Sequence, residues 1–208
     1  MLGLVLRNHS YQARRQRLQA LQYLDLGCGP NTHRDFINID YHWHPGVDIC
    51  WDIRKRLPFP DGRFSGIFTE HCLEHFPLST TRAILAEAKR ALAKNGRIRI
   101  VVPDAELYLR TYVAQLDGAA SCDFPFQQRE RSVPLYTPLW SVNRVWYYER
   151  ESLFGHRWMY DFQQLARLLG DIGYRDVTKC RFGEGVMTKL ILDTPKRSVE
   201  SLYVEAIA

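Results

Sequence analysis

The sequence predicts an α/β fold, a doubly wound and mostly parallel sheet. Two observations predict it. Short segments with the pattern of strands alternate with segments of helical periodicity along most of the chain, as in sheets with helices on their faces. The first such segment, Tyr23-Leu24-Asp25-Leu26, leads directly into a turn with two glycines, which is typical of the start of a nucleotide-binding α/β domain.

Composition indicates one globular domain. The chain has 208 residues, of which 46% are hydrophobic and 25% charged, so extensive disorder is excluded and we expect a single domain over residues 1–208. The longest apolar run, residues 98–103, is too short to span a bilayer. Arg7 ends the apolar start and no cleavage site follows, so we expect a cytoplasmic protein. The five cysteines lack paired spacing, which predicts free thiols.

The elements follow from periodicity and turn residues. We expect Ser79 or Thr80 to begin the helix after the fourth strand, and Asn95-Gly96 to end it. Gly173 should end the last helix. The expected strands are residues 23–26, 36–40, 47–50, 64–69, 98–102, 174–180 and 201–207, and the expected helices are residues 11–22, 79–93, 104–115 and 161–172.

Acidic residues stand where successive strands end. Asp25 closes the first strand before Gly27-Cys28-Gly29, Asp40 closes the second, and Asp52 follows the third. Because parallel strands end at one edge of the sheet, these side chains should meet there. An acid after the second strand is suited to bind the two hydroxyls of a ribose.

These segments together resemble the class I S-adenosylmethionine-dependent methyltransferases. A small bacterial branch of that family is also similar at residues 156–162 and 201–205. The resemblance is carried by Leu24-Asp25-Leu26-Gly27-Cys28-Gly29, Ile37-Asn38-Ile39-Asp40, Asp52-Ile53, Leu57-Pro58-Phe59-Pro60-Asp61-Gly62-Arg63-Phe64 and Glu70-His71-Cys72-Leu73-Glu74-His75.

The resemblance implies a Rossmann-like sheet with an antiparallel last strand and S-adenosylmethionine as the cofactor. Two features depart from the family pattern: residues 30–36 leave room only for a turn where a helix is usual, and Ser65 replaces the usual aspartate after Phe64. The residues implied for the cofactor are Asp25, Gly27, Cys28 and Gly29 for its methionine part, Asp40 for the ribose, Asp52 and Ile53 for the adenine, and Glu70 beside it.

Two other readings of the same residues compete. A nicotinamide dinucleotide would suit the acid after the second strand, but Thr32 stands where Gly-x-Gly-x-x-Gly needs its third glycine. His71, Glu74 and His75 match the His-x-x-Glu-His spacing of a zinc protease, with Glu149 as a conceivable further ligand. That motif requires a long helix, whereas a strand precedes it here and a proline follows, so we expect no metal.

Histidines are the candidate catalytic groups. His71 and His75 follow the fourth strand, where the related enzymes place groups that face the methyl sulfonium. Methyl transfer requires in-line alignment and, for a hydroxyl acceptor, a base, for which a histidine is suited. His71 is the first choice. The alternative is that one histidine caps the next helix and the other packs beneath the sheet.

Residues 117–150 form an irregular insertion with many aromatic and arginine side chains. Because the insertion follows the fifth strand, we expect it to be a lid over the substrate, with Arg144, Trp146 and Arg150 as binding residues. The alternative is that its aromatic side chains only pack against the sheet.

The sequence thus predicts methyl transfer from S-adenosylmethionine to an oxygen or nitrogen of a small-molecule or glycan-linked acceptor. A sugar is favoured because the bacterial branch is associated with surface polysaccharide assembly. One alternative is an RNA methyltransferase, supported by the Arg-rich start and the pI of 9.0, although the chain has no separate RNA-binding domain. Another is a cofactor-binding protein without catalysis, which the short first loop and Ser65 would explain.

Overall fold

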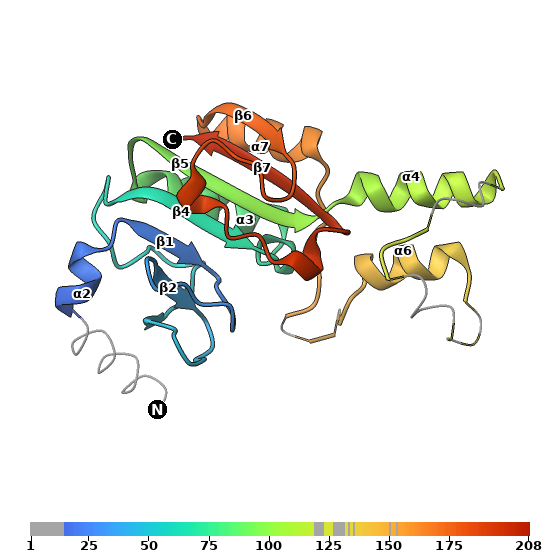
Figure 1. The fold of residues 1–208 in the computed structure, drawn as a ribbon, viewed down its shortest axis with the longest axis horizontal. Helices are drawn as coiled ribbons and strands as arrows, with labels where there is room; N and C mark the ends of the chain where they lie inside the picture. Colours follow the sequence, from blue (N-terminus) through green and yellow to red (C-terminus); the bar gives the residue numbers. More distant parts are fainter. Residues whose placement is uncertain are drawn as a thin grey trace.

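The computed structural model describes residues 15–118, 123–126, 132, 134, 136–149, 151–152 and 154–208. Its centre is a sheet of strand order β3-β2-β1-β4-β5-β7-β6, in which the pairs from β3 to β5 are parallel (Figure 1). Strand β7 is antiparallel to both β5 and β6. The predicted Rossmann-like fold with an antiparallel last strand is confirmed.

The strands lie close to their expected positions, and the fifth is longer than expected. Their bounds are β1 Tyr23–Leu26, β2 Ile37–Asp40, β3 Ile49–Cys50, β4 Phe64–Glu70, β5 Leu92–Pro103, β6 Arg175–Cys180 and β7 Ser201–Ile207. The helices are α2 Arg15–Ala20, α3 Leu78–Ala91, α4 Ala105–Leu116, α6 Pro138–Trp146 and α7 Phe162–Ile172, with 3-10 turns η1 Leu73–His75, η2 Thr188–Leu190 and η3 Pro195–Arg197.

The two faces of the sheet are covered differently. Helices α3 and α7 pack their apolar sides against one face, and Leu85 and Leu169 are fully buried there. Residues 181–200 cover the other face, where Leu190 of η2 packs on Phe68 and Tyr203. This irregular segment therefore covers its face of the sheet, whereas helices cover the opposite face.

A buried arginine fixes residues 181–200 to the sheet. Arg99 of β5 is fully buried and donates to both carboxylate oxygens of Asp193, at 2.7 and 2.5 Å. It also donates to Glu205 of β7 at 3.1 Å and to the carbonyl of Glu184 at 2.9 Å. A buried guanidinium with two carboxylates and a carbonyl has the partners it needs, and it places Thr194 beside the end of β4.

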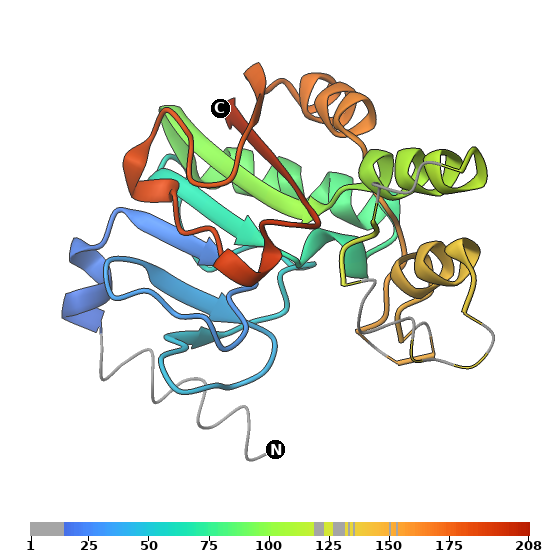
Figure 2. The ribbon, with the colours of Figure 1, turned by 45° about the vertical axis from the view of Figure 1, so that its right-hand side comes forward.

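Helices α4 and α6 lie beyond the carboxyl end of β5, side by side in both ribbon views (Figures 1 and 2). They share an apolar cluster of Tyr108 from α4, Val142 and Val145 from α6, and Phe124. The carboxyl ends of the parallel strands point toward this pair. The structure thus places the insertion at the edge of the sheet where ligands bind in open α/β folds.

Some local predictions were wrong. Helix α3 begins at Leu78 after Pro77, without a side-chain cap from Ser79 or Thr80. It ends at Ala91, and the chain passes directly into β5, so Asn95-Gly96 lies in that strand and does not cap the helix.

Predictions at other positions held fully or in part. Gly173 ends α7 in the left-handed conformation, as predicted. The prediction that residues 117–150 are irregular was wrong in part, because they contain helix α6, which Pro138 begins.

Cys28, Cys50, Cys72 and Cys180 are free thiols, and Cys122 lies outside the described residues. Among the described helices, none combines the length and apolar character that crossing a bilayer would require.

Candidate active site

The glycine turn and the acid of the second strand meet, as the strand-end argument predicts. The amide of Gly27 donates to the carbonyl of Ile39 at 2.9 Å, and the amide of Gly29 donates to the carboxylate of Asp40 at 2.9 Å. The other oxygen of Asp40 accepts from the amide of His42 at 2.8 Å. The carboxylate is therefore oriented by two backbone amides before any ligand binds.

The two glycines of the turn are needed for different reasons. A side chain at Gly27 would put its Cβ 2.2 Å from the thiol sulfur of Cys72, so this position is closed by packing. A Cβ at Gly29 would meet no atom within 4 Å, although its φ of +53° also favours glycine. The surface at Gly29 is thus open for a ligand to approach the backbone.

Asp25 is a buried carboxylate without a hydrogen-bonding partner for one of its oxygens. Its side chain is 2% exposed, and its Oδ2 has no hydrogen bond within the described part of the chain. The nearest basic group is His33, with Nε2 4.0 Å from that oxygen. Burial raises the pKa of Asp25 well above its ordinary value, and the carboxylates of Glu70 and Asp40 raise it further. A cation that reached this oxygen would therefore be bound strongly.

The remaining residues implied for the cofactor have partners within the chain. Both oxygens of Asp52 are bound by the guanidinium of Arg54, at 2.8 and 2.9 Å, while Ile53 is buried. Glu70 accepts from the amide of Thr194 at 2.8 Å and from its hydroxyl. The Cys28 thiol is buried, and burial raises its pKa, so it is a packing group in this turn. The chain forms only turns between β1 and β2, all of whose residues are described.

His71 lies at the junction between this turn and the region of α6. Its φ of +47° is in the left-handed region, which costs energy in a residue with a side chain. Its Nε2 lies 2.8 Å from Oγ of Ser201, and its Nδ1 lies 3.3 Å from Oε1 of Glu74. The ring is thus held between a hydroxyl and a carboxylate, the arrangement that orients an imidazole base.

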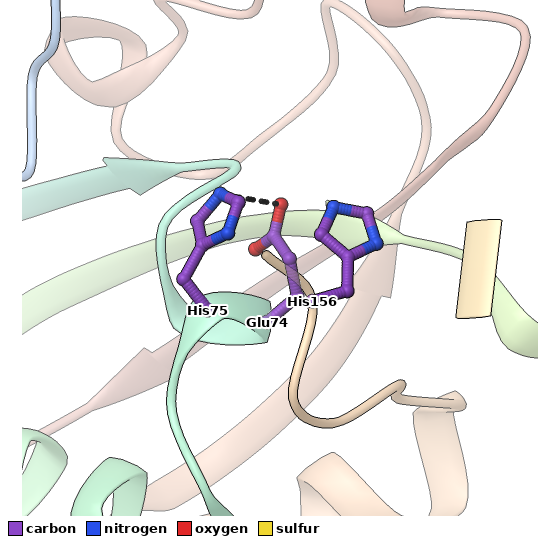
Figure 3. Close-up of side chains that lie close together, drawn as sticks. All are labelled: Glu74, His75 and His156. Carbon is purple, nitrogen blue, oxygen red and sulfur yellow. Dashed lines mark ion pairs between the residues drawn. The ribbon is translucent and has the colours of Figure 1, made fainter. Parts of the chain in front are cut away.

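Glu74 is a fully buried carboxylate among imidazoles (Figure 3). His75 and His156 flank it, with His75 Nε2 3.9 Å from Glu74 Oε1 and the two rings 5.1 Å apart. Burial alone would raise the pKa of Glu74, but His71, His75 and His156 outweigh it and lower the pKa to about 2. Burial lowers the pKa of His156, so this ring is neutral at pH 7. Glu74 itself is therefore ionised.

A cavity of about 470 Å³ opens in front of these residues. Aromatic and charged side chains surround it, which suits a polar acceptor with a flat or ring-shaped body. Its lining includes His71, Glu74, His75, Tyr108, Phe126, Ser141, Arg144, Tyr148, Glu149, Phe154, His156, Arg197 and Glu200.

Of the three residues expected to bind the substrate from the insertion, the structure places only Arg144 at this cavity. Arg144 lines this cavity, and its guanidinium lies over the ring of Trp140 at 5.9 Å. Trp146 packs against the α4/α6 cluster and lines a neighbouring cavity, so it does not face His71. Arg150 lies outside the described residues.

Sequence reasoning missed several residues of this site. His156 lies 82 positions after Glu74 and Ser201 lies 130 positions after His71, and no spacing rule connects such distant residues. Thr194, which binds Glu70, belongs to the irregular segment that Arg99 fixes. The only signal for this segment in the sequence is its charged residues, one of which, Asp193, is buried in an ion pair with Arg99.

Comparisons with known proteins give the family and the fold of the chain. The family model described as a methyltransferase domain matches residues 5–179. No curated protein sequence matches the chain.

Solved structures share the fold at low sequence identity. An S-adenosylmethionine-dependent methyltransferase from Archaeoglobus fulgidus is 14% identical, with a TM-score of 0.51 and coverage of 97% of this chain and 94% of its own. A 1,6-didemethyltoxoflavin N1-methyltransferase from Burkholderia thailandensis is 16% identical, with a TM-score of 0.50 and coverage of 97% and 76%.

Proposed function

The chain belongs to the methyltransferase domain family and uses S-adenosylmethionine as its methyl donor. We propose that it methylates an oxygen or nitrogen of a small-molecule or glycan-linked acceptor. The observation that carries this proposal is the position of His71. The ring lines the cavity of about 470 Å³, and the acids implied for the cofactor precede it on the same edge of the sheet. We further propose that the enzyme works in the cytoplasm.

The strand-end residues fit the cofactor. The unpartnered Oδ2 of Asp25 would accept from the ammonium group of its methionine part, and the open surface at Gly29, in the turn Gly27-Cys28-Gly29, would meet the adjacent atoms of the cofactor. Asp40 would bind the ribose hydroxyls, because Gly29 and His42 already orient its carboxylate.

The other residues implied for the cofactor are buried or already paired within the chain. Ile53 would contact the adenine from its buried position. Asp52 would have to share its carboxylate between Arg54 and the adenine amino group, and Glu70 would act from its place beside Thr194.

His71 is the base in this proposal. When bound, S-adenosylmethionine supplies an electrophilic methyl group on a sulfonium. Methylation of a hydroxyl releases one proton. A proton on Nδ1, favoured by the ionised Glu74, leaves the Nε2 lone pair of His71 to accept it. Ser201 holds Nε2 at 2.8 Å, and an acceptor hydroxyl would take the place of its Oγ. His75 lines the same cavity as a second histidine near the acceptor.

The size and lining of the cavity support a small acceptor. Arg144 and Arg197 supply positive charge, while Glu149 and Glu200 supply negative charge. Such a mixture suits an acceptor with several hydroxyl or amino groups, such as a sugar, more than a polyanionic strand. The similar enzyme from Burkholderia thailandensis was solved with 1,6-didemethyltoxoflavin and S-adenosylhomocysteine bound, so a small heterocycle is that protein's ligand.

The test has two stages. Calorimetric titration with S-adenosylhomocysteine should show one site per chain. Labelled S-adenosylmethionine should then transfer its methyl group to members of a panel of sugars, glycosides and small amines, and not to total RNA. Transfer to RNA alone would support the RNA methyltransferase instead. Cofactor binding without transfer to any member would support the protein without catalysis.

A histidine pair sharpens the test of the base. His71→Asn should lower turnover by about 100-fold while S-adenosylhomocysteine affinity stays within about twofold. His44→Asn, a half-buried histidine outside the cavity lining, should change neither quantity. An unchanged turnover in His71→Asn would remove this residue from the mechanism.

A further inference from the structure

We propose that Glu74, His75 and His156 bind one divalent transition-metal ion of the zinc class at the edge of the acceptor cavity. One potential ligand atom from each residue lies within 4.8 Å of those of the other two. The carboxylate lies between the two rings (Figure 3). This inference goes beyond methyl transfer and does not depend on it.

The carboxylate gives the first argument. Glu74 is 0% exposed, and no hydrogen bond of normal geometry reaches either of its side-chain oxygens from the described residues, although His71 Nδ1 lies 3.3 Å from Oε1. Buried polar groups are almost always hydrogen-bonded, and a buried carboxylate is normally paired or bound to a metal. A buried carboxylate with both oxygens unsatisfied, next to ring nitrogens of His75 and His156, indicates a ligand between these groups.

The tautomer of His156 gives the second argument. Its Nδ1 lies 2.5 Å from the carbonyl oxygen of Val145, which can only accept a hydrogen bond. The proton must therefore be on Nδ1, and Nε2 carries the lone pair. Histidine ligands of metals usually donate their other N–H to a carbonyl or carboxylate in this way, because the bond fixes both the tautomer and the ring. Helix α6 thus supplies the carbonyl group that accepts the Nδ1–H of His156 and fixes its ring for metal binding through Nε2.

The donor set and the distances suit a transition metal. Two imidazole nitrogens and one carboxylate form the protein part of many catalytic zinc sites, and oxygen-preferring ions such as Mg²⁺ are less suited. An ion about 2.1 Å from each of three ligands places them about 3.0 to 3.6 Å apart. Glu74 Oε1 and His75 Nε2 are 3.9 Å apart, so small side-chain rotations are sufficient to close the site.

The surroundings leave one side of the site open. Glu74, His75 and His156 all line the cavity of about 470 Å³, so an ion bound by the three would face it. Three protein ligands with an open position are typical of catalytic rather than structural zinc sites. A hydroxyl or carboxylate of a molecule in the cavity could take that position.

This site differs from the His-x-x-Glu-His motif of the sequence. That motif needs both histidines on one long helix, whereas η1 has three residues and His71 precedes it. His71 directs Nε2 to Ser201 instead. The third ligand here is His156, which the fold brings from a distant segment. The two ligand sets can therefore be distinguished by mutation.

The experiment uses the untagged full chain, treated with chelator and then freed of it. Titration with Co²⁺ should produce visible d–d absorption that saturates at one ion per chain, and Zn²⁺ should displace it. His75→Ala and His156→Ala should each weaken Co²⁺ binding by at least about 100-fold. His44→Ala, the matched histidine outside the cluster, should bind as the wild type does, and His71→Ala should remain within about tenfold.

Three results would overturn the inference. The first is a wild-type protein that gives no saturable absorption with Co²⁺ and no rise in unfolding temperature with Zn²⁺. The second is one-to-one binding that persists in the double variant H75A/H156A. The third is loss of binding in His71→Ala with retention in His156→Ala, which would return the site to the sequence motif. Circular dichroism of each variant checks the fold, and the wild-type spectrum decides the question if a variant does not fold.

Discussion

Two buried carboxylates at the same edge of the sheet have opposite surroundings. Asp25 in β1 is 2% exposed and has Glu70 and Asp40 as its charged neighbours, so its pKa is raised. Glu74 after β4 is 0% exposed and has three imidazoles around it, so its pKa falls to about 2. Burial acts in the same direction on both. The difference therefore comes entirely from the neighbours that the fold supplies.

This contrast separates the two halves of the site. At Asp25 the chain collects negative charge and leaves one oxygen unpaired, so the missing cation must come from a ligand. At Glu74 the chain provides its own imidazoles, and they lower the pKa of this carboxyl group without any contribution from the cofactor. The first half is thus arranged for binding and costs stability in the free protein, whereas the second stabilises the free protein.

The largest expected effect is on stability at Glu74. Glu74→Gln removes the charge that holds three imidazoles and should lower the free energy of unfolding by about 3 kcal/mol at neutral pH. Urea unfolding in the presence of chelator measures this without any contribution from metal. Glu184→Gln, an exposed control, should change the value by less than about 0.5 kcal/mol. Equal stability of the Glu74 variant and wild type would show that the histidines do not compensate the buried charge.

The next effect is on cofactor affinity at Asp40. Asp40→Ala should weaken S-adenosylmethionine binding by about 1 to 3 kcal/mol, because the ribose hydroxyls would lose a charged partner and Gly29 would lose its orienting carboxylate. Calorimetry measures the loss. Asp35→Ala, which breaks only an exposed ion pair with Lys189, is the control and should bind normally. Unchanged affinity in Asp40→Ala would remove this residue from the cofactor site.

Asp25 should respond in the opposite sense from Glu74. Asp25→Asn removes an unpaired buried charge and should raise the free energy of unfolding by about 1 kcal/mol at pH 7, while weakening cofactor binding. Because the folded-state pKa is raised, the wild type loses stability as pH rises from about 4 through that pKa. The gain should therefore vanish near pH 3, where both folded and unfolded wild type are protonated.

Urea unfolding at several pH values checks the Asp25 prediction. Asp171→Asn, in an exposed pair with Arg82, should show no such dependence. A variant at Asp25 that is less stable than wild type at pH 7 would mean that the carboxylate has a partner in the free protein.

The halves also differ in how far the sequence could predict them. Asp25, Gly29 and Asp40 lie within 16 residues, and their positions follow from local rules: a strand ends, a glycine turn follows and the next strand returns parallel to the first. Glu74, His156 and Ser201 come from three distant segments. Their meeting depends on α6 and on residues 181–200, where the carbonyl of Val145 and the buried Arg99 decide the placement.

The same reason explains the errors in local structure. The helix cap expected at Asn95-Gly96 obeyed a valid local rule, but pairing of β5 with β4 begins already at Leu92 and ends the helix first. Tertiary pairing therefore overrode a local signal. The parallel sheet itself was predictable because its strands are short apolar segments that turns and helices separate along the chain.

The smallest expected effect concerns Arg144, the lid residue that the structure does place at the cavity. Its side chain is exposed at the edge and lies over Trp140, so its removal should cost little stability. Arg144→Ala should raise the KM for the acceptor by about fivefold, since one of the positive charges that line the cavity would be lost. Affinity for S-adenosylhomocysteine should stay within about twofold, because Asp25 and Asp40 lie on other strands. Arg110→Ala on α4, whose guanidinium pairs with Glu106 at 2.7 Å outside the cavity, is the matched control. Equal losses of acceptor and cofactor binding in Arg144→Ala would mean that α6 helps to form the cofactor pocket, and the division between the two halves would then be wrong.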